Sequence, residues 1–188
     1  GFRLASGKET IDDKSIYSCN TVTVNGDTTI TANGANYAQG IYSEYSNVTF
    51  NKDTSKDTDT EVNITATSTG DYAYAVRMLG DKNSGSNEFT NSKITFNNDL
   101  TKLNAKSEKY AWGVVTSGGN DGCGAYFNGK KLEIDVEAGE QAVGVNAQYG
   151  AGAIASSADT SIIIGSNATN GSAYGIATDL YYGEVAGA

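Results

Sequence analysis

The sequence predicts an all-β fold, a parallel β-helix (β-solenoid) of about five to six rungs with outer-face loop insertions. A signature, Ala-x-[Gly/Ala]-[Ile/Val], recurs at intervals of 35, 38, 31 and 31 residues, beginning at Ala38, Ala73, Ala111, Ala142 and Ala173. Such a period is typical of stacked arrays in which no single repeat could bury its apolar face alone. Gly and Tyr are abundant and proline is absent, which suits continuous strand pairing because proline deletes a ladder donor.

The chain is predicted to be a single solenoid segment over residues 1–188, with a cap or lead-in at 1–18 and repeats over 19–188. Residues 1–18 lack the signature and are rich in charge. Ahead of each signature lie short β-branched stretches with a period of two, which predict strands. They cover residues 22–24 and 29–31, then 48–50 and 62–64, then 94–96 and 103–105. The fourth repeat compresses into Leu132–Val136 and the fifth has Ile162–Ile164, so each unit holds up to three strands.

Turns between these strands are predicted by glycine-containing pairs. The clearest are Asn25-Gly26, Asn33-Gly34, Asn128-Gly129 and Asn170-Gly171. Two polar stretches, Asn51–Glu61 and Gly80–Glu88, lengthen the second and third units and explain the two longer intervals. Insertions in repeat arrays map to loops, so we expect both stretches on the outer face.

An antiparallel β-sandwich of hairpins is the alternative fold for short strands separated by turns. A sandwich places each strand at a different kind of site, so its strands differ in character. A solenoid places equivalent strands directly above one another, so they look alike. The signature strands do look alike, which favours the solenoid.

The last signature position is aliphatic in every repeat, which predicts one buried column of Ile41, Val76, Val114, Val145 and Ile176. Simple alternation would then turn the Ala and Gly positions outward, whereas a bend or bulge at the Gly would let the Ala and the aliphatic residue both face inward. The sequence leaves both arrangements open. Two other sets of equivalent repeat positions predict stacked columns of side chains. One comprises Tyr37, Tyr72 and Tyr110, and the other Gln39, Tyr74, Trp112, Val143 and Tyr174.

Charge and composition exclude several classes of function. The net charge is −9, with 13 Lys and Arg against 22 Asp and Glu, so no nucleic-acid partner is expected. No apolar run approaches the ~18 residues that span a bilayer, so we expect no membrane insertion by this segment. Histidine is absent, which removes the commonest general base and transition-metal ligand. We therefore expect no enzyme activity, no catalytic, cofactor-binding or metal-binding residues, and no cofactor.

Some acidic residues are minor candidates for a site. The densest acidic stretch, which could offer oxygens to Ca²⁺, comprises Asp53, Asp57, Asp59 and Glu61. Its preferred interpretation is a solvated loop with interleaved lysines. Residues 81–88 resemble half a calcium loop, but their glycine sits one place early. Asp135 and Glu137 share one side of a strand, which predicts a polar outer face rather than the paired carboxylates of a glycosidase.

Other residue types carry weaker indications. The aromatic columns and Trp112 could bind sugar rings, although packing is the preferred interpretation. Asn47, Asn63, Asn167 and Asn170 begin Asn-x-[Ser/Thr] sequons. Cys19 and Cys123 would lie about three rungs apart in a stacked array, beyond the ~7 Å limit for a disulfide, so two free thiols are expected.

The repeats resemble the passenger repeats of bacterial autotransporters and related surface adhesins. The likeness covers about residues 20–180 and lies in the recurring Tyr72–Val76, Tyr110–Val114 and Ala173–Ile176 segments, each after Thr- and Asn-rich strands. It implies a right-handed β-helix stalk that is secreted and displayed on the bacterial outer surface. The membrane barrel and signal peptide of such proteins are not found in this sequence.

The expected function is therefore a non-enzymatic extracellular stalk or adhesion segment. Its partners would be a host or bacterial surface protein or glycan, or other copies of itself. One alternative is a carbohydrate-active β-helix of lyase, hydrolase or phage-tailspike type. Another is a self-assembling surface-layer or fibre subunit. Residues 180–185 carry no polar cap, so we expect this end to continue into further repeats or to dock against another copy.

Overall fold

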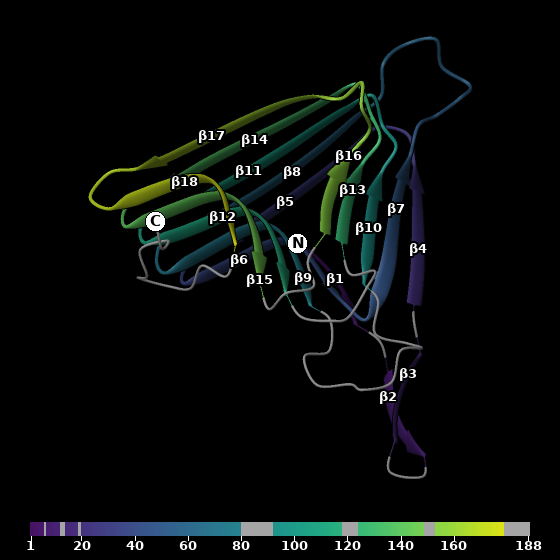
Figure 1. Cartoon of the computed structure of the whole chain (residues 1–188), viewed down its shortest axis with the longest axis horizontal. Coiled ribbons are helices and arrows are strands. Elements are labelled where there is room, and N and C mark those ends of the chain that lie inside the picture. The colour runs from purple at the N-terminus through teal and green to yellow at the C-terminus, as the bar shows by residue number, and fades with distance from the viewer. Residues whose placement is uncertain are drawn as a thin grey trace.

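The structure is a computed structural model that describes residues 1–5, 7–11, 14–18, 20–79, 92–117, 124–148 and 153–178, and every regular element in these ranges is a β-strand. Three parallel sheets run alongside one another (Figure 1). The first has six strands: β1 (Phe2–Ala5), β6 (Tyr37–Glu44), β9 (Tyr72–Leu79), β12 (Tyr110–Ser117), β15 (Gln141–Gln148) and β18 (Ser172–Thr178). The second has five: β4 (Asn20–Asn25), β7 (Ser46–Asn51), β10 (Lys93–Phe96), β13 (Gly124–Phe127) and β16 (Ala153–Ser156). The third also has five: β5 (Thr28–Gly34), β8 (Glu61–Ser68), β11 (Leu100–Ser107), β14 (Lys131–Ala138) and β17 (Ser161–Ala168).

From β4 onward the chain visits the second, third and first sheets in turn, and each circuit adds one strand to each sheet. All pairings between successive rungs in the described ranges are parallel. The predicted parallel β-helix is confirmed, and the antiparallel sandwich is wrong.

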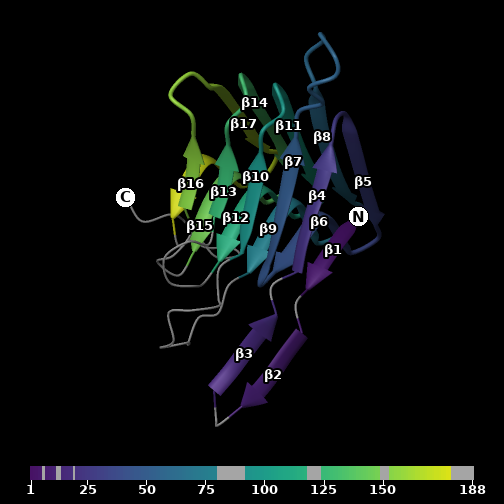
Figure 2. The same ribbon diagram turned by 90° about the vertical axis from the view of Figure 1, so that its right-hand side faces the viewer.

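The amino-terminal residues contribute both an array strand and a hairpin. β1 pairs with β6 and places Phe2 beside Ile41, so it begins the first sheet. β2 (Gly7–Ile11) and β3 (Lys14–Ser18) form an antiparallel pair, which projects from one end of the array (Figure 2).

The predicted aliphatic column is confirmed in its register, but the prediction that all five members are buried is wrong for Ile176. Its members are paired in register: Ile41, Val76, Val114, Val145 and Ile176. The first four are at most 6% exposed and lie in the core between the sheets. Ile176, on the last described rung, is 73% exposed.

The chain bends at the glycine of the signature, so the alanine and the aliphatic residue both face inward. Ala38 and Ile41 belong to the same buried core, and a Cβ at Gly40 would lie 2.4 Å from Ile64 Cγ2. Gly113 and Gly144 meet the isoleucines of the third sheet in the same way. Of the two arrangements left open by the sequence, the bend is confirmed, and the outward-facing alanine is wrong.

Two strands were not foreseen, because the fourth repeat was expected to compress and the fifth to hold fewer strands. β13 and β16 complete both rungs in the second sheet. β13 reads Gly-Ala-Tyr-Phe: Tyr and Phe favour strands, but Gly and Ala do not, so a run of only four residues gave no clear strand signal. Its signal is positional: Phe127 pairs with Phe96, which pairs with Phe50.

These three phenylalanines form a buried ladder in the second sheet. The ring centroids of Phe50 and Phe96 lie 5.1 Å apart, and those of Phe96 and Phe127 lie 4.9 Å apart, with nearly parallel planes. Stacking of identical rings at successive rungs fixes the register of the second sheet while burying large apolar area.

An asparagine ladder follows the phenylalanine ladder at the corner between the second and third sheets. Asn51 donates to Asn25, Asn97 to Asn51 and Asn128 to Asn97, each from Nδ2 to Oδ1 at 2.9–3.2 Å. Each amide satisfies its neighbour, so the corner repeats from rung to rung without leaving these polar groups unpaired.

Candidate functional site

A row of small polar residues crosses the rungs on the outward face of the third sheet. Its members pair in register from strand to strand: Thr31, Thr65, Asn104, Asp135 and Gly165. They face outward because their neighbours along each strand, such as Ile64 and Ala66, are buried in the core. We call this row the floor.

Longer side chains flank the floor on both sides. One wall contains Asn63, Lys102, Glu133 and Ile163, and the other contains Thr67, Lys106, Glu137 and Asn167. Floor and walls together form a trough that runs across the strands and therefore along the axis of the helix.

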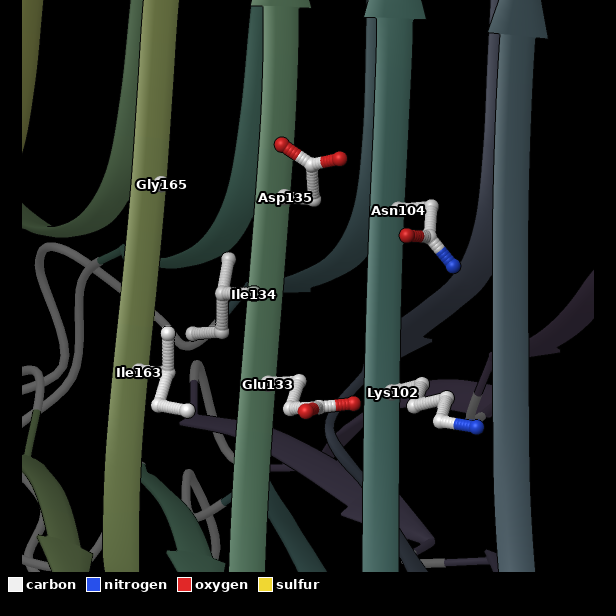
Figure 3. A pocket seen from close by; sticks show the side chains of 7 residues that line it. All are labelled: Lys102, Asn104, Glu133, Ile134, Asp135, Ile163 and Gly165. Atoms are coloured by element: carbon white, nitrogen blue, oxygen red, sulfur yellow. The ribbon is translucent and has the colours of Figure 1, made fainter.

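Two adjoining depressions of about 320 Å³ and 200 Å³ occupy the trough and share Asn104 and Asp135. In the larger one these two side chains lie next to each other on neighbouring strands (Figure 3). Gly165 has no side chain, so the space beside Asp135 stays open. A Cβ at Gly165 would be in ordinary van der Waals contact with Asp135, 3.4 Å from its Oδ1 atom. Ile163 is 52% exposed and adds an apolar surface to the wall.

Ion pairs within the third sheet neutralise most charges of the walls. Lys102 Nζ lies 3.1 Å from Glu61 Oε2, and Lys106 pairs with Glu137 on the next rung. Lys131 pairs with Glu133 along β14, and its hydrogen bond lowers the pKa of the Glu133 carboxyl. These pairs are solvent-exposed, so each stabilises the fold only slightly.

Asp135 differs from the acids beside it. Glu133, Asp135 and Glu137 all point outward from β14, which confirms the predicted polar outer face. Among the described residues, Asp135 makes no ion pair, whereas both glutamates do. The trough therefore offers one carboxylate outside the ion pairs, within electrostatic range of Lys106, on a floor of hydroxyl and amide groups.

The acidic stretch proposed for Ca²⁺ does not converge on one point. Asp53 accepts hydrogen bonds from Ser55, Asp59 pairs with Lys130, and Glu61 begins β8. In the described part of the chain, no group of three His, Cys, Asp or Glu side chains is placed to hold a metal ion. Residues 81–88 and both cysteines lie outside the described residues.

Asp99 anchors the loop at residues 52–60, a role that sequence reasoning missed. This carboxylate is 6% exposed and lies 2.8 Å from Lys52 Nζ and 3.0 Å from Lys130 Nζ. Thr60 also donates to it from its backbone N–H and its hydroxyl. The hydrogen bond from Lys52, aided by those from Thr60 and Lys130, holds the Asp99 pKa well below its usual range despite burial. The loop is thus fixed to the next two rungs.

The predicted aromatic columns are present on the outward face of the first sheet. Tyr74 and Trp112 stack at 4.9 Å and are only 2% and 1% exposed. Tyr72 and Tyr110 stack at 5.4 Å, and Tyr37 lies 5.9 Å from Tyr72. Trp112 and Tyr74 are buried, so their rings pack against neighbouring residues and are not accessible to a sugar. This agrees with packing as the preferred interpretation of the columns.

Both arginines of the chain lie beside Tyr42 on this face. The guanidinium carbons of Arg3 and Arg77 are 5.4 Å and 6.0 Å from its ring centroid. Tyr42 donates its hydroxyl to Glu44 at 3.0 Å, and burial together with this bond raises the Tyr42 pKa to about 12. The group is a structural cation–π arrangement that joins the first three strands of the sheet.

The sequon asparagines are accessible to different degrees. Asn47 and Asn63 are half-buried on their strands, whereas Asn167 and Asn170 are exposed. Asn63 also accepts a hydrogen bond from Asn104 at 3.4 Å. Within the described ranges there is no helix of the length and apolar character that a membrane span requires.

Comparison with known proteins gives no match to a family model, to a curated protein or to a solved structure. The functional argument therefore depends on the chemistry of this chain alone.

Proposed function

We propose that this chain is a non-enzymatic, extracellular segment of a bacterial surface protein that serves as a β-helical stalk or adhesive surface. The observation that carries the proposal is the pairing of outward charges between rungs. Lys102 forms an ion pair with Glu61, and Lys106 forms one with Glu137, so each pair links two neighbouring rungs. A hydrolase or lyase would instead need acids left free and close together.

The architecture supports a spacer. Each rung repeats the same core columns and corner contacts, so length can grow by adding rungs without a new core. Parallel pairing in three sheets resists bending in every direction across the axis. A segment built in this way suits the separation of an attachment point from a binding tip.

The proposed setting is the outer surface of a bacterium, with the segment secreted. Its partners would be a host or bacterial surface protein or glycan, or other copies of the chain. The net charge of −9 keeps such a surface soluble and disfavours nucleic acid.

Surface display can be tested directly on the source cells. Antibodies against the purified segment should label intact, unpermeabilised cells, and brief protease treatment of those cells should remove the label. Beads coated with the segment should bind the target cells better than beads coated with an unrelated acidic protein. Labelling only after permeabilisation would contradict the proposed location, and no bead binding would leave the stalk role without the adhesive one.

A carbohydrate-active β-helix is the second candidate, favoured by one observation. The larger depression places Asp135, which has no ion pair in the described structure, next to Asn104, and Lys102 also lines it. The purified segment should release no reducing ends or unsaturated products from a polysaccharide panel. If the segment cleaves a polysaccharide and Asp135→Asn abolishes that cleavage, an enzyme would be the better explanation.

A self-assembling subunit is the third candidate. Ile162 and Ile176 continue the buried columns but are 47% and 73% exposed on the last described rung. Sedimentation that shifts to larger species with concentration, and returns to monomer with Ile176→Asp, would favour assembly. A concentration-independent monomer would exclude it under those conditions.

A further inference from the structure

We propose that the trough on the third sheet binds an uncharged, extended oligosaccharide that lies along the helix axis. The inference deepens the adhesive role proposed above, and it rests on that role for its biological setting. It commits to a ligand class and to the floor residues Asn104, Asp135 and Gly165.

The first argument is spacing. Each rung contributes one floor residue, and successive rungs are ~4.8 Å apart. A pyranose ring with its glycosidic bond is about as long as one rung, so each sugar unit meets one new floor group. An extended peptide presents side chains on one face about every 6.6 Å, a spacing that does not match the ~4.8 Å between floor residues.

The second argument is the chemistry of the floor. Thr65, Asn104 and Asp135 offer a hydroxyl, an amide and a carboxylate side by side. Together they donate and accept hydrogen bonds, which sugar hydroxyl groups require. The exposed Ile163 and the lysine stems of the walls supply apolar surface for the C–H face of a ring.

The third argument is charge. Lys102, Lys106 and Lys131 are already paired with carboxylates on the same face. A polyanion would have to displace those carboxylates and would also meet the carboxylate of Asp135. The trough therefore favours an uncharged chain over an acidic glycan.

Gly165 provides a variant that fills the trough without removing a contact. Its side of the strand is open, with Asp135 Oδ1 3.4 Å from the site of a Cβ as the nearest group. A leucine there would occupy the depression while β17 keeps its pairing. Ser161→Leu is the matched control, because it adds the same side chain to the same outward face of β17, beyond the wall.

The experiment titrates the purified chain with cellohexaose, laminarihexaose and maltohexaose and records amide chemical shifts by NMR. Cellohexaose, whose chain is extended, should bind with shifts centred on Thr65, Asn104, Asp135 and Gly165, and laminarihexaose and maltohexaose, whose chains coil, should bind more weakly. Gly165→Leu should weaken that binding at least tenfold, and Ser161→Leu should leave it within twofold.

Three outcomes would overturn the proposal. These are no binding of any of the three hexasaccharides, shifts centred on another face, or tighter binding of polygalacturonate than of the uncharged chains. Cell-surface labelling is independent of these results, so a stalk on the surface without glycan binding would refute this inference alone.

Discussion

At the scale of single residues, two neighbours restrict the glycine of the signature: an isoleucine methyl in the third sheet, and a backbone carbonyl oxygen of the next rung at 2.5–2.6 Å from the position of a Cβ. Gly40, Gly113 and Gly144 face the Cγ2 methyls of Ile64, Ile134 and Ile164, at 2.2–2.4 Å from the position of a Cβ. The second repeat has alanine at this place, Ala75, and the residue in register with those isoleucines is Leu103. Leucine is not branched at Cβ and lacks that methyl, which explains why the larger alanine fits there.

This pairing predicts a compensating double mutant. Gly113→Ala should lower the free energy of unfolding by about 1–3 kcal/mol, because the new methyl crowds both Ile134 Cγ2 and the backbone carbonyl oxygen of Gly144 in a packed core. Adding Ile134→Leu should restore part of the loss by removing the methyl in the way. Denaturant unfolding of both single variants and the double variant gives the coupling energy. Strict additivity of the two changes would show that side-chain crowding is not the reason for glycine.

Asp99 predicts a pH dependence with a defined sign. Its folded-state pKa is depressed, so its contribution is present above the ordinary Asp value of about 3.9 and is lost as pH falls below it. Asp99→Asn should destabilise the protein by about 1–3 kcal/mol at neutral pH, since Lys52 loses its partner and Lys130 keeps only Asp59. Urea unfolding from pH 7 to pH 3 should show this difference constant down to about pH 5 and smaller below. A difference that widens on acidification would contradict the assignment.

At the scale of elements, the corners matter as much as the strands. The asparagine ladder joins four successive rungs between the second and third sheets, beside the stacked phenylalanines. The loop at residues 52–60 adds a second link through Asp99. Corners of this kind tie one rung to the next where the strands end.

Interior and terminal members of the ladder should differ in their contribution to stability. Asn97 both donates to Asn51 and accepts from Asn128, whereas Asn128 makes only the one ladder bond in the described structure. Asn97→Ala should cost about twice as much as Asn128→Ala, at ~1 kcal/mol for each lost bond. Chemical denaturation of the two variants measures the ratio. Equal losses would mean that the ladder bonds contribute little.

Much of the fold could be predicted from the sequence because the repeat exposes equivalent positions. The aliphatic column and the tyrosine columns followed from comparing repeats, and the bend at the glycine was one of two options. β13 was not predicted because its Gly-Ala-Tyr-Phe run is short and only its last two residues favour strands. The trough was not predicted because its floor residues share no residue type, and only the strand register shows that they are aligned. These residues are Thr65, Asn104, Asp135 and Gly165. Asp99 was missed for the same reason: its partners Lys52, Thr60 and Lys130 come from the two rungs on either side of it.

At the scale of the whole molecule, successive circuits of the chain stack in parallel and in register. Thr65 and Asn104 are then direct neighbours on adjacent rungs, and Thr65 and Asp135 are two rungs apart. Neighbouring rungs are separated by ~4.8 Å, which falls within the Cα separation that a disulfide allows, and twice that distance does not.

Engineered disulfides in a Cys19→Ser, Cys123→Ser background test this claim most directly. Thr65→Cys with Asn104→Cys should oxidise to an intramolecular disulfide in the folded protein, read by mass spectrometry of non-reduced peptides. Thr65→Cys with Asp135→Cys should stay reduced under the same mild oxidation. A folded protein in which the adjacent pair fails to link, or in which the two-rung pair links as readily, would contradict the stacked parallel array.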